Sequence, residues 1–128
     1  GNTYLMDGQG NINVNAPNDM TFTAGKNMNI NVGQNMTTTV GMNKSNSVGM
    51  NNVESIGMMD AKTIGADSIL NVMGKLTEMI EGDVESVTKK GKTVYNSGDG
   101  LETNSHGTIF RFAETEIRHN SQEKSKNH

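Results

Sequence analysis

The sequence has no cysteine and no tryptophan, and it has a single proline. Without cysteine, neither disulfide bonds nor thiolate metal sites can stabilise the fold. Aromatic residues make up 4% and hydrophobic residues 32% of the chain, which is meagre for the core of an ordinary compact domain. The formal net charge of −3 gives no basic surface, so we expect no nucleic-acid partner. A packed globular domain is therefore not the expected architecture.

Motifs that carry catalytic chemistry are missing as well. No GxGxxG opens a helix and no GxxxxGK is present, so a phosphate-binding loop is not expected. Serine, histidine and aspartate occur, but no nucleophile motif brings them together. We therefore expect that the protein is not an enzyme and needs no cofactor.

What the sequence does have is a period of eight residues. Each repeat contains an apolar residue that is followed directly by glycine. From Gly74 onward the glycine comes one place later, but the apolar residues stay eight residues apart. The candidate corners are Gly25, Gly33, Gly41, Gly49, Gly57, Gly65, Gly74 and Gly82. The candidate apolar column is Val32, Val40, Val48, Ile56, Ile64, Val72 and Ile80.

An even period fits a strand and not a helix. Successive residues of a strand point to opposite faces, so eight residues return the same face each time. Apolar residues do alternate with polar ones, as at Ile12, Val14 and Ala16. We interpret each octad as a strand of about six residues and a two-residue corner, with glycine at the corner because it reaches positive φ freely. Pro17 stands at one such corner.

A single octad carries too little apolar area to offset the entropy lost on ordering it. Either successive octads stack as coils of one chain, or several chains wind around a common axis. Single-chain coils usually need more than eight residues, so we favour several chains. The predicted fold is all-β: an intertwined homotrimeric triple-stranded β-helix, a triangular prism built from octad repeats.

The predicted inward positions become polar in the middle of the chain. Charged and amide residues replace methionine and isoleucine there, and charge in a dry interior is costly unless it is paired. Three explanations stay open: water or ions inside, pairing between chains, or a register change that turns Val53 or Ile69 inward. The residues concerned are Lys44, Asn46, Asn52, Glu54, Asp60 and Lys62.

Outside the regular octads the pattern loosens. The shift of glycine to Gly74 and Gly82 predicts an extra residue at the corner, as in a β-bulge, and a helix over residues 75–87 is the less favoured alternative. We predict a needle over residues 1–119, with regular octads at about 16–80, less regular ones at 81–107 and a terminal strand at 108–119. A polar tail follows at 120–128. Near the start, Tyr4 to Met6 predict a strand that ends in a tight reversal at DGQG.

The run VGQNMTTTVGMNKSNSVGMNNVESIG resembles the octad repeats of contractile-tail spike needles, namely VgrG proteins of type VI secretion systems and phage spikes. This resemblance implies a homotrimeric structural needle that punctures a target membrane mechanically. It also implies a PAAR-type tip protein or an effector at the C-terminal end. Such a needle is assembled in the bacterial cytoplasm on a contractile tail and ejected, or it is part of a phage virion tail.

Two further hypotheses accompany this one. A trimeric surface-adhesin head or stalk is the alternative function, although its repeats are usually longer than eight residues. His106 and His119 are weak metal candidates, because one histidine per chain near a threefold axis would supply three imidazoles. The sequence lacks the HxH arrangement with which some spike relatives bind metal. The chain has no initiator methionine or signal peptide, so we expect it to begin inside a longer protein.

Overall fold

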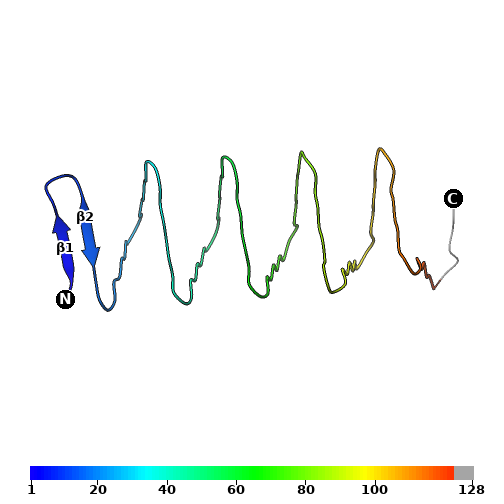
Figure 1. Cartoon of the computed structure of the whole chain (residues 1–128), viewed down its shortest axis with the longest axis horizontal. Coiled ribbons are helices and arrows are strands. Elements are labelled where there is room, and N and C mark those ends of the chain that lie inside the picture. The colour runs from blue at the N-terminus through cyan, green and yellow to red at the C-terminus, as the bar shows by residue number, and fades with distance from the viewer. Residues whose placement is uncertain (123–128) are drawn as a thin grey trace. The chain divides into compact units, whose positions relative to one another are not determined.

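The computed structural model describes residues 1–122, and these residues contain two short strands and no helix (Figure 1). The predicted all-β class is therefore confirmed, and the alternative helix over residues 75–87 is not formed. No helix with the length and apolar character needed to cross a membrane is found in this part of the chain. Residues 123–128, which include most of the predicted polar tail, lie outside the described residues.

An antiparallel hairpin opens the chain. Strand β1 (Thr3–Met6) pairs with β2 (Ile12–Asn15), with Thr3 opposite Asn15 and Met6 opposite Ile12. The predicted strand at Tyr4 to Met6 and the reversal that follows it are both confirmed. Because alternate residues of a strand point to opposite faces, one face of the hairpin carries only apolar and aromatic side chains: Tyr4, Met6, Ile12 and Val14.

The hairpin loop is fixed by one carboxylate and two glycines. The Asp7 carboxylate accepts hydrogen bonds from the backbone N–H of Gln9 at 2.8 Å, from the backbone N–H of Asn11 at 3.2 Å and from Asn11 Nδ2 at 2.7 Å. Gly8 and Gly10 have φ of 77° and 93°, a region that side chains with a Cβ rarely enter. The DGQG sequence thus supplies both the acceptor and the backbone freedom that this reversal needs.

After β2 the chain consists of extended segments separated by bends. From residue 17 to residue 82 a two-residue bend begins every eight residues. A three-residue bend follows at 89–91, and bends eight residues apart resume at 98–99, 106–107 and 114–115. The regular bends occupy residues 17–18, 25–26, 33–34, 41–42, 49–50, 57–58, 65–66, 73–74 and 81–82.

The extra corner residue lies at a different place from the predicted one. Gly74 and Gly82 are the second residues of their bends instead of the first, and the bend spacing stays at eight. Compared with the earlier octads, the glycine lies one place later while the bend keeps its position, so no residue is inserted at Gly74 or Gly82. The insertion is at Lys89, Lys90 and Gly91, where the next bend begins nine residues after residue 89.

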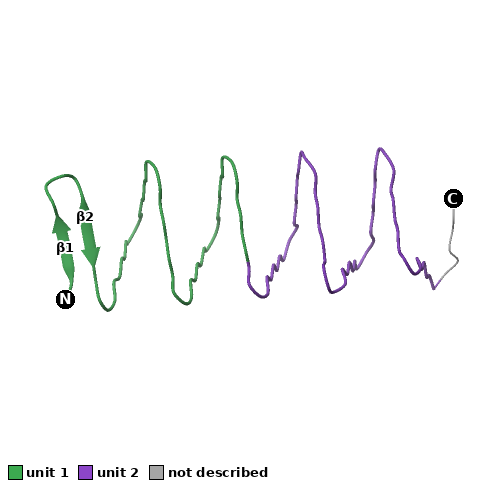
Figure 2. Cartoon of the chain, viewed as in Figure 1, with its two compact units in different colours: residues 1–63 green, residues 64–128 purple. Residues whose placement is uncertain are grey.

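The octads are extended but are not paired strands within one chain. A strand is defined by its ladder partner, and among residues 16–122 the structure has no such ladder. The segment 108–119, predicted as one strand, is divided by the bend at 114–115. The chain has two compact units, Gly1–Thr63 and Ile64–His128 (Figure 2); the first contains the hairpin and the first octads.

Candidate functional site

Every hydrophobic residue in the described part of the chain is exposed except Ala16, which is half-buried, but the exposure is not equal. The Val and Ile residues that directly precede the regular bends, from Val32 to Ile80, are 43–56% exposed. Val53, Ile69 and Met79, which lie on the opposite face, are 88–90% exposed. The extended segments therefore have two different faces. We call the face that carries the residue before each bend the column face.

In the octads that begin at residues 17 and 25, the column face is entirely apolar. Because a strand alternates its faces, this side also carries the residues three and five places after the start of each bend. In the first octads these are Met20, Phe22, Met28 and Ile30, and the even-numbered apolar face of the hairpin has the same alternation. Side chains of this kind are stabilised by burial, at about 25 cal/mol per Å² of apolar area. One chain alone leaves them in water.

The charged residues of the octads between residues 41 and 64 lie on this same face. Bends stay eight residues apart from residue 17 to residue 82, so the alternation of faces is not shifted between them. The register change considered from the sequence therefore does not occur, and Val53 and Ile69 stay on the opposite face. Four charged side chains share the column face with Val48 and Ile56: Lys44, Glu54, Asp60 and Lys62.

The corner glycines do not have the conformation predicted for them. Among the described residues, only Gly8 and Gly10 have positive φ, so Gly25 and its equivalents turn the chain at negative φ. A Cβ added at any corner from Gly25 to Gly82 would meet no atom of its own chain within 4 Å. Other residues also begin bends: Pro17, Met73, Glu81, His106 and Glu114. The bend position therefore tolerates a side chain, which explains why Gly74 and Gly82 can move one place.

Sequence reasoning missed a second type of corner near the C-terminal end. Ser97 Oγ accepts a hydrogen bond from Gly100 N at 3.1 Å, and Ser105 Oγ accepts one from Gly107 N at 3.1 Å. The hydroxyl oxygens of Thr88 and Thr93 lie 2.6 Å apart across the three-residue bend. Thr88, Ser97 and Ser105 occupy the position before the bend that valine or isoleucine holds earlier. The sequence signal that could have located these corners is the eight-residue period, which resumes after a single step of nine residues from residue 89 to residue 98.

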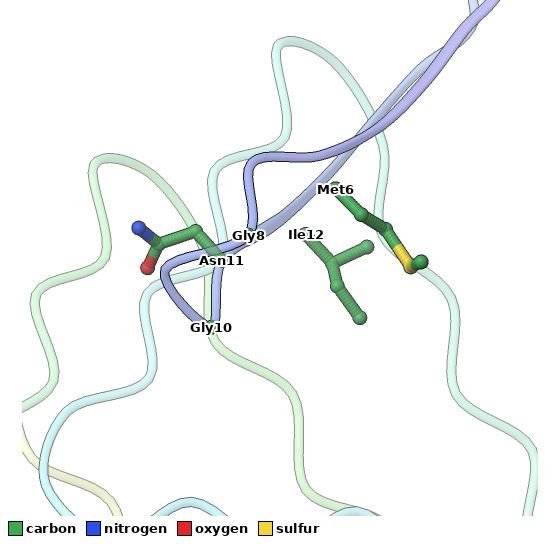
Figure 3. Close-up of a pocket in the computed structure, with 5 residues that line it drawn as sticks. All are labelled: Met6, Gly8, Gly10, Asn11 and Ile12. Atoms are coloured by element: carbon green, nitrogen blue, oxygen red, sulfur yellow. The ribbon is translucent and has the colours of Figure 1, made fainter.

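The hairpin has a small hollow at its loop end. The hollow has a volume of about 300 Å³ and is lined by Met6, Gly8, Gly10, Asn11 and Ile12. Figure 3 shows the side chains of Met6 and Ile12 lying side by side, with the Asn11 amide on the other side of the loop. The hydrogen bond from the Asn11 side chain, followed by those from the backbone of Gln9 and Asn11, lowers the pKa of the exposed Asp7 carboxyl.

The two histidines singled out from the sequence are not brought together. His106 begins a bend and lines a shallow hollow of about 350 Å³ with Asn104 and Ser105, whereas His119 follows the next bend. Within residues 1–122 no group of three or more potential metal ligands is formed. A site with one histidine from each of three chains stays a prediction.

The surface that remains is suited to association: an apolar face repeated every eight residues, with no partner in its own chain. Residues 5–105 match the family model of the bacteriophage T4 gp5 C-terminal trimerisation domain. Searches of curated proteins and of solved structures gave no significant match. The matched residues contain the hairpin from Leu5 onward and all bends from residue 17 to residue 99. The chain belongs to the family of the bacteriophage T4 gp5 C-terminal trimerisation domain.

Proposed function

We propose that three copies of this chain wind into a triple-stranded β-helix that is the structural needle of a tail spike. The observation that carries the proposal is the family match over residues 5–105, in which the described bends recur with the eight-residue period. The family is named for trimerisation, and the column face is a surface that needs partners. Each bend would carry the chain from one face of a triangular prism to the next, and the column faces would be buried against each other along the axis.

Mechanical stiffness would be the mechanism of such a needle. Hydrogen bonds between neighbouring chains would pair the backbone groups that the octads leave free in one chain. A closed prism has no free sheet edge, so it would resist bending and unfolding under load. We propose that this rigid element is driven through a target envelope by a contractile injection machine, as in VgrG-like spikes of type VI secretion systems or in phage tails.

The proposed role is structural and not catalytic. By resemblance to spike needles, the C-terminal end would carry a PAAR-type tip protein or an effector. The needle would be assembled in the bacterial cytoplasm on a contractile tail and ejected, or it would belong to a phage virion tail. The family match favours this spike role over a trimeric surface adhesin, the alternative suggested by the repeats.

The oligomeric state tests the proposal. The mass of the purified chain is measured by sedimentation equilibrium, and we expect about three times the chain mass of 13.8 kDa. Circular dichroism of the same sample should show β structure well beyond the eight strand residues of the hairpin, because the octads gain ladder partners on assembly. A monomer at micromolar concentration, or a trimer without additional β structure, would refute the intertwined needle.

A further inference from the structure

The charges that the column face carries between residues 41 and 64 are balanced in sign. In the octads that begin at Gly41, Gly49 and Gly57, the positions three and five places after the bend start carry two lysines and two carboxylates. Their formal charges cancel. In the three octads before them, the same positions carry no charged residue at all. The balance suggests that these four side chains face each other.

None of the four charges finds its partner within one chain. Lys44, Glu54, Asp60 and Lys62 are exposed, and in the described part of the chain none of them makes an ion pair or a hydrogen bond. By contrast, Arg118 and Glu116, two residues apart on the opposite face, form an ion pair of 2.5 Å within the chain. Short-range pairing is thus possible in this backbone, but Asp60 and Lys62, with the same two-residue spacing, do not use it.

Threefold symmetry decides which residues become neighbours. If each octad crosses one face of the prism and the next octad crosses the next face, a given face is crossed in turn by octads n, n+1 and n+2 of three different chains. These strands are parallel and lie about 4.8 Å apart. A residue therefore lies beside the residue eight places later in a neighbouring chain.

Glu54 and Lys62 are eight residues apart and hold the same octad position, five places after the start of the bend. We infer that Glu54 of one chain forms an ion pair with Lys62 of the neighbouring chain inside the trimer, so that three such pairs ring the axis. This inference rests on the proposed trimeric needle. Lys44 and Asp60 share the other position, three places after the bend start, with Asn52 between them. Asn52 can donate to Asp60 of one neighbour and hold a polar contact toward Lys44 of the other.

Such pairs would give the assembly its register. A slip of one octad would change the offset between neighbouring chains from eight residues to zero or sixteen. Glu54 would then lie beside another Glu54 or beside Leu70 instead of Lys62, which leaves its buried charge without a partner. Leaving one member of a buried ion pair without its partner is strongly destabilising. The apolar column alone would not prevent the slip, because Val or Ile would still lie beside Val or Ile after it. The ion pairs therefore specify which octads meet, and the column supplies the driving force.

A charge-reversal experiment tests the inference on the whole chain. Glu54→Lys should lose the trimer at concentrations where the unchanged chain stays assembled, and Lys62→Glu should do the same. The double variant Glu54→Lys with Lys62→Glu should recover the trimer. Lys75 and Asp83 provide the matched control, because they also lie eight residues apart in consecutive octads but on the opposite face. Lys75→Asp, Asp83→Lys and their combination should leave the trimer unchanged.

The outcomes separate the two proposals. If the unchanged chain is not a trimer, the needle fails and the ion pair falls with it. If the unchanged chain is a trimer but the double reversal does not recover assembly, or if single reversals at Lys75 and Asp83 do the same damage, the interchain pair alone is refuted. Asp60→Asn tests whether Asp60 of the same chain is the partner of Lys62. When this substitution is added to the double reversal, the trimer should still be recovered. The rescue should persist at 0.5 M salt, which screens exposed charges but acts little on buried ones.

Discussion

The hairpin and the octads solve the same problem in opposite ways. Both are extended chain with alternating faces, but β1 and β2 satisfy each other's backbone within one chain, and the octads do not. The hairpin is local: five residues connect its strands, and Asp7 ties the loop together. The octads repeat one short segment that has no ladder partner within the described part of the chain. The comparison teaches that the hairpin carries its own folding information, whereas the octads carry information about assembly.

Glycine shows the same difference on a smaller scale. Gly8 and Gly10 are required by their own backbone, because their φ values are positive. The corner glycines are not, since they bend at negative φ and have open space around the missing Cβ. Glycine therefore has a conformational role in the hairpin, whereas the structure of one chain shows no such role for the glycines of the octads.

Deleting half an octad should give the largest difference between the two regions, because it should disrupt assembly and leave the hairpin intact. Deletion of residues 35–38 keeps the bends at 33–34 and 41–42 but leaves them only four residues apart. Four residues span at most about 14 Å, too short to cross a face that eight residues cross. We expect loss of the trimer in sedimentation equilibrium and an intact hairpin, followed by the nuclear Overhauser effect between Tyr4 and Val14. The control is the larger deletion of residues 33–40, a complete octad without charged side chains, which keeps the bend spacing at eight. A trimer that survives the smaller deletion as well as the larger one contradicts the octad as the unit of assembly.

A charge on the column face should be the next most damaging change. Val48→Asp places a carboxylate in the proposed interior, where an unpaired charge costs several kilocalories per mole, and each trimer contains three copies. Val53→Asp is the matched control, because Val53 is on the opposite face, 88% exposed. Thermal unfolding followed by circular dichroism should show a large loss of stability for the first variant and little change for the second. Equal losses would mean that the column face is not the buried one.

Alanine at two glycines compares the regions directly. Gly8→Ala forces a residue with a Cβ to φ near 77°, which costs about 1–2 kcal/mol. Gly41→Ala needs no such conformation, and Pro17, Met73 and Glu81 stand at equivalent bend positions, so we expect a change within about 1 kcal/mol. Amide hydrogen exchange in the hairpin reports the first effect, and thermal unfolding of the trimer reports the second. Severe destabilisation by Gly41→Ala would show that a neighbouring chain occupies the space beside the corner.

The sequence predicted the parts of this chain that depend on period and local chemistry. The hairpin followed from an apolar run and DGQG, and the spacing of bends followed from the glycine and Val/Ile columns. Two features escaped prediction because glycine was taken to mark the corner itself. The bend stays in place when glycine moves to Gly74, and it continues without the apolar column once Ser97 and Ser105 cap it with hydroxyl groups. The homotrimer was also predicted, because one octad carries too little apolar area to fold alone, and the family match supports it.

Acidification should loosen the hairpin loop slightly. Hydrogen bonds to its ionised form hold the pKa of Asp7 below the usual value, so the carboxylate stabilises the folded loop at any pH above the unfolded-state pKa. That contribution is lost as the pH falls through the lower folded-state pKa, in the region below about pH 4. Amide exchange at Gln9 and Asn11, whose N–H groups bind this carboxylate, should quicken there relative to the intrinsic exchange rate. Asp7→Asn should abolish this pH dependence while the apolar pairs Tyr4 with Val14 and Met6 with Ile12 remain. An unchanged pH dependence in that variant would assign the titration to another carboxyl group.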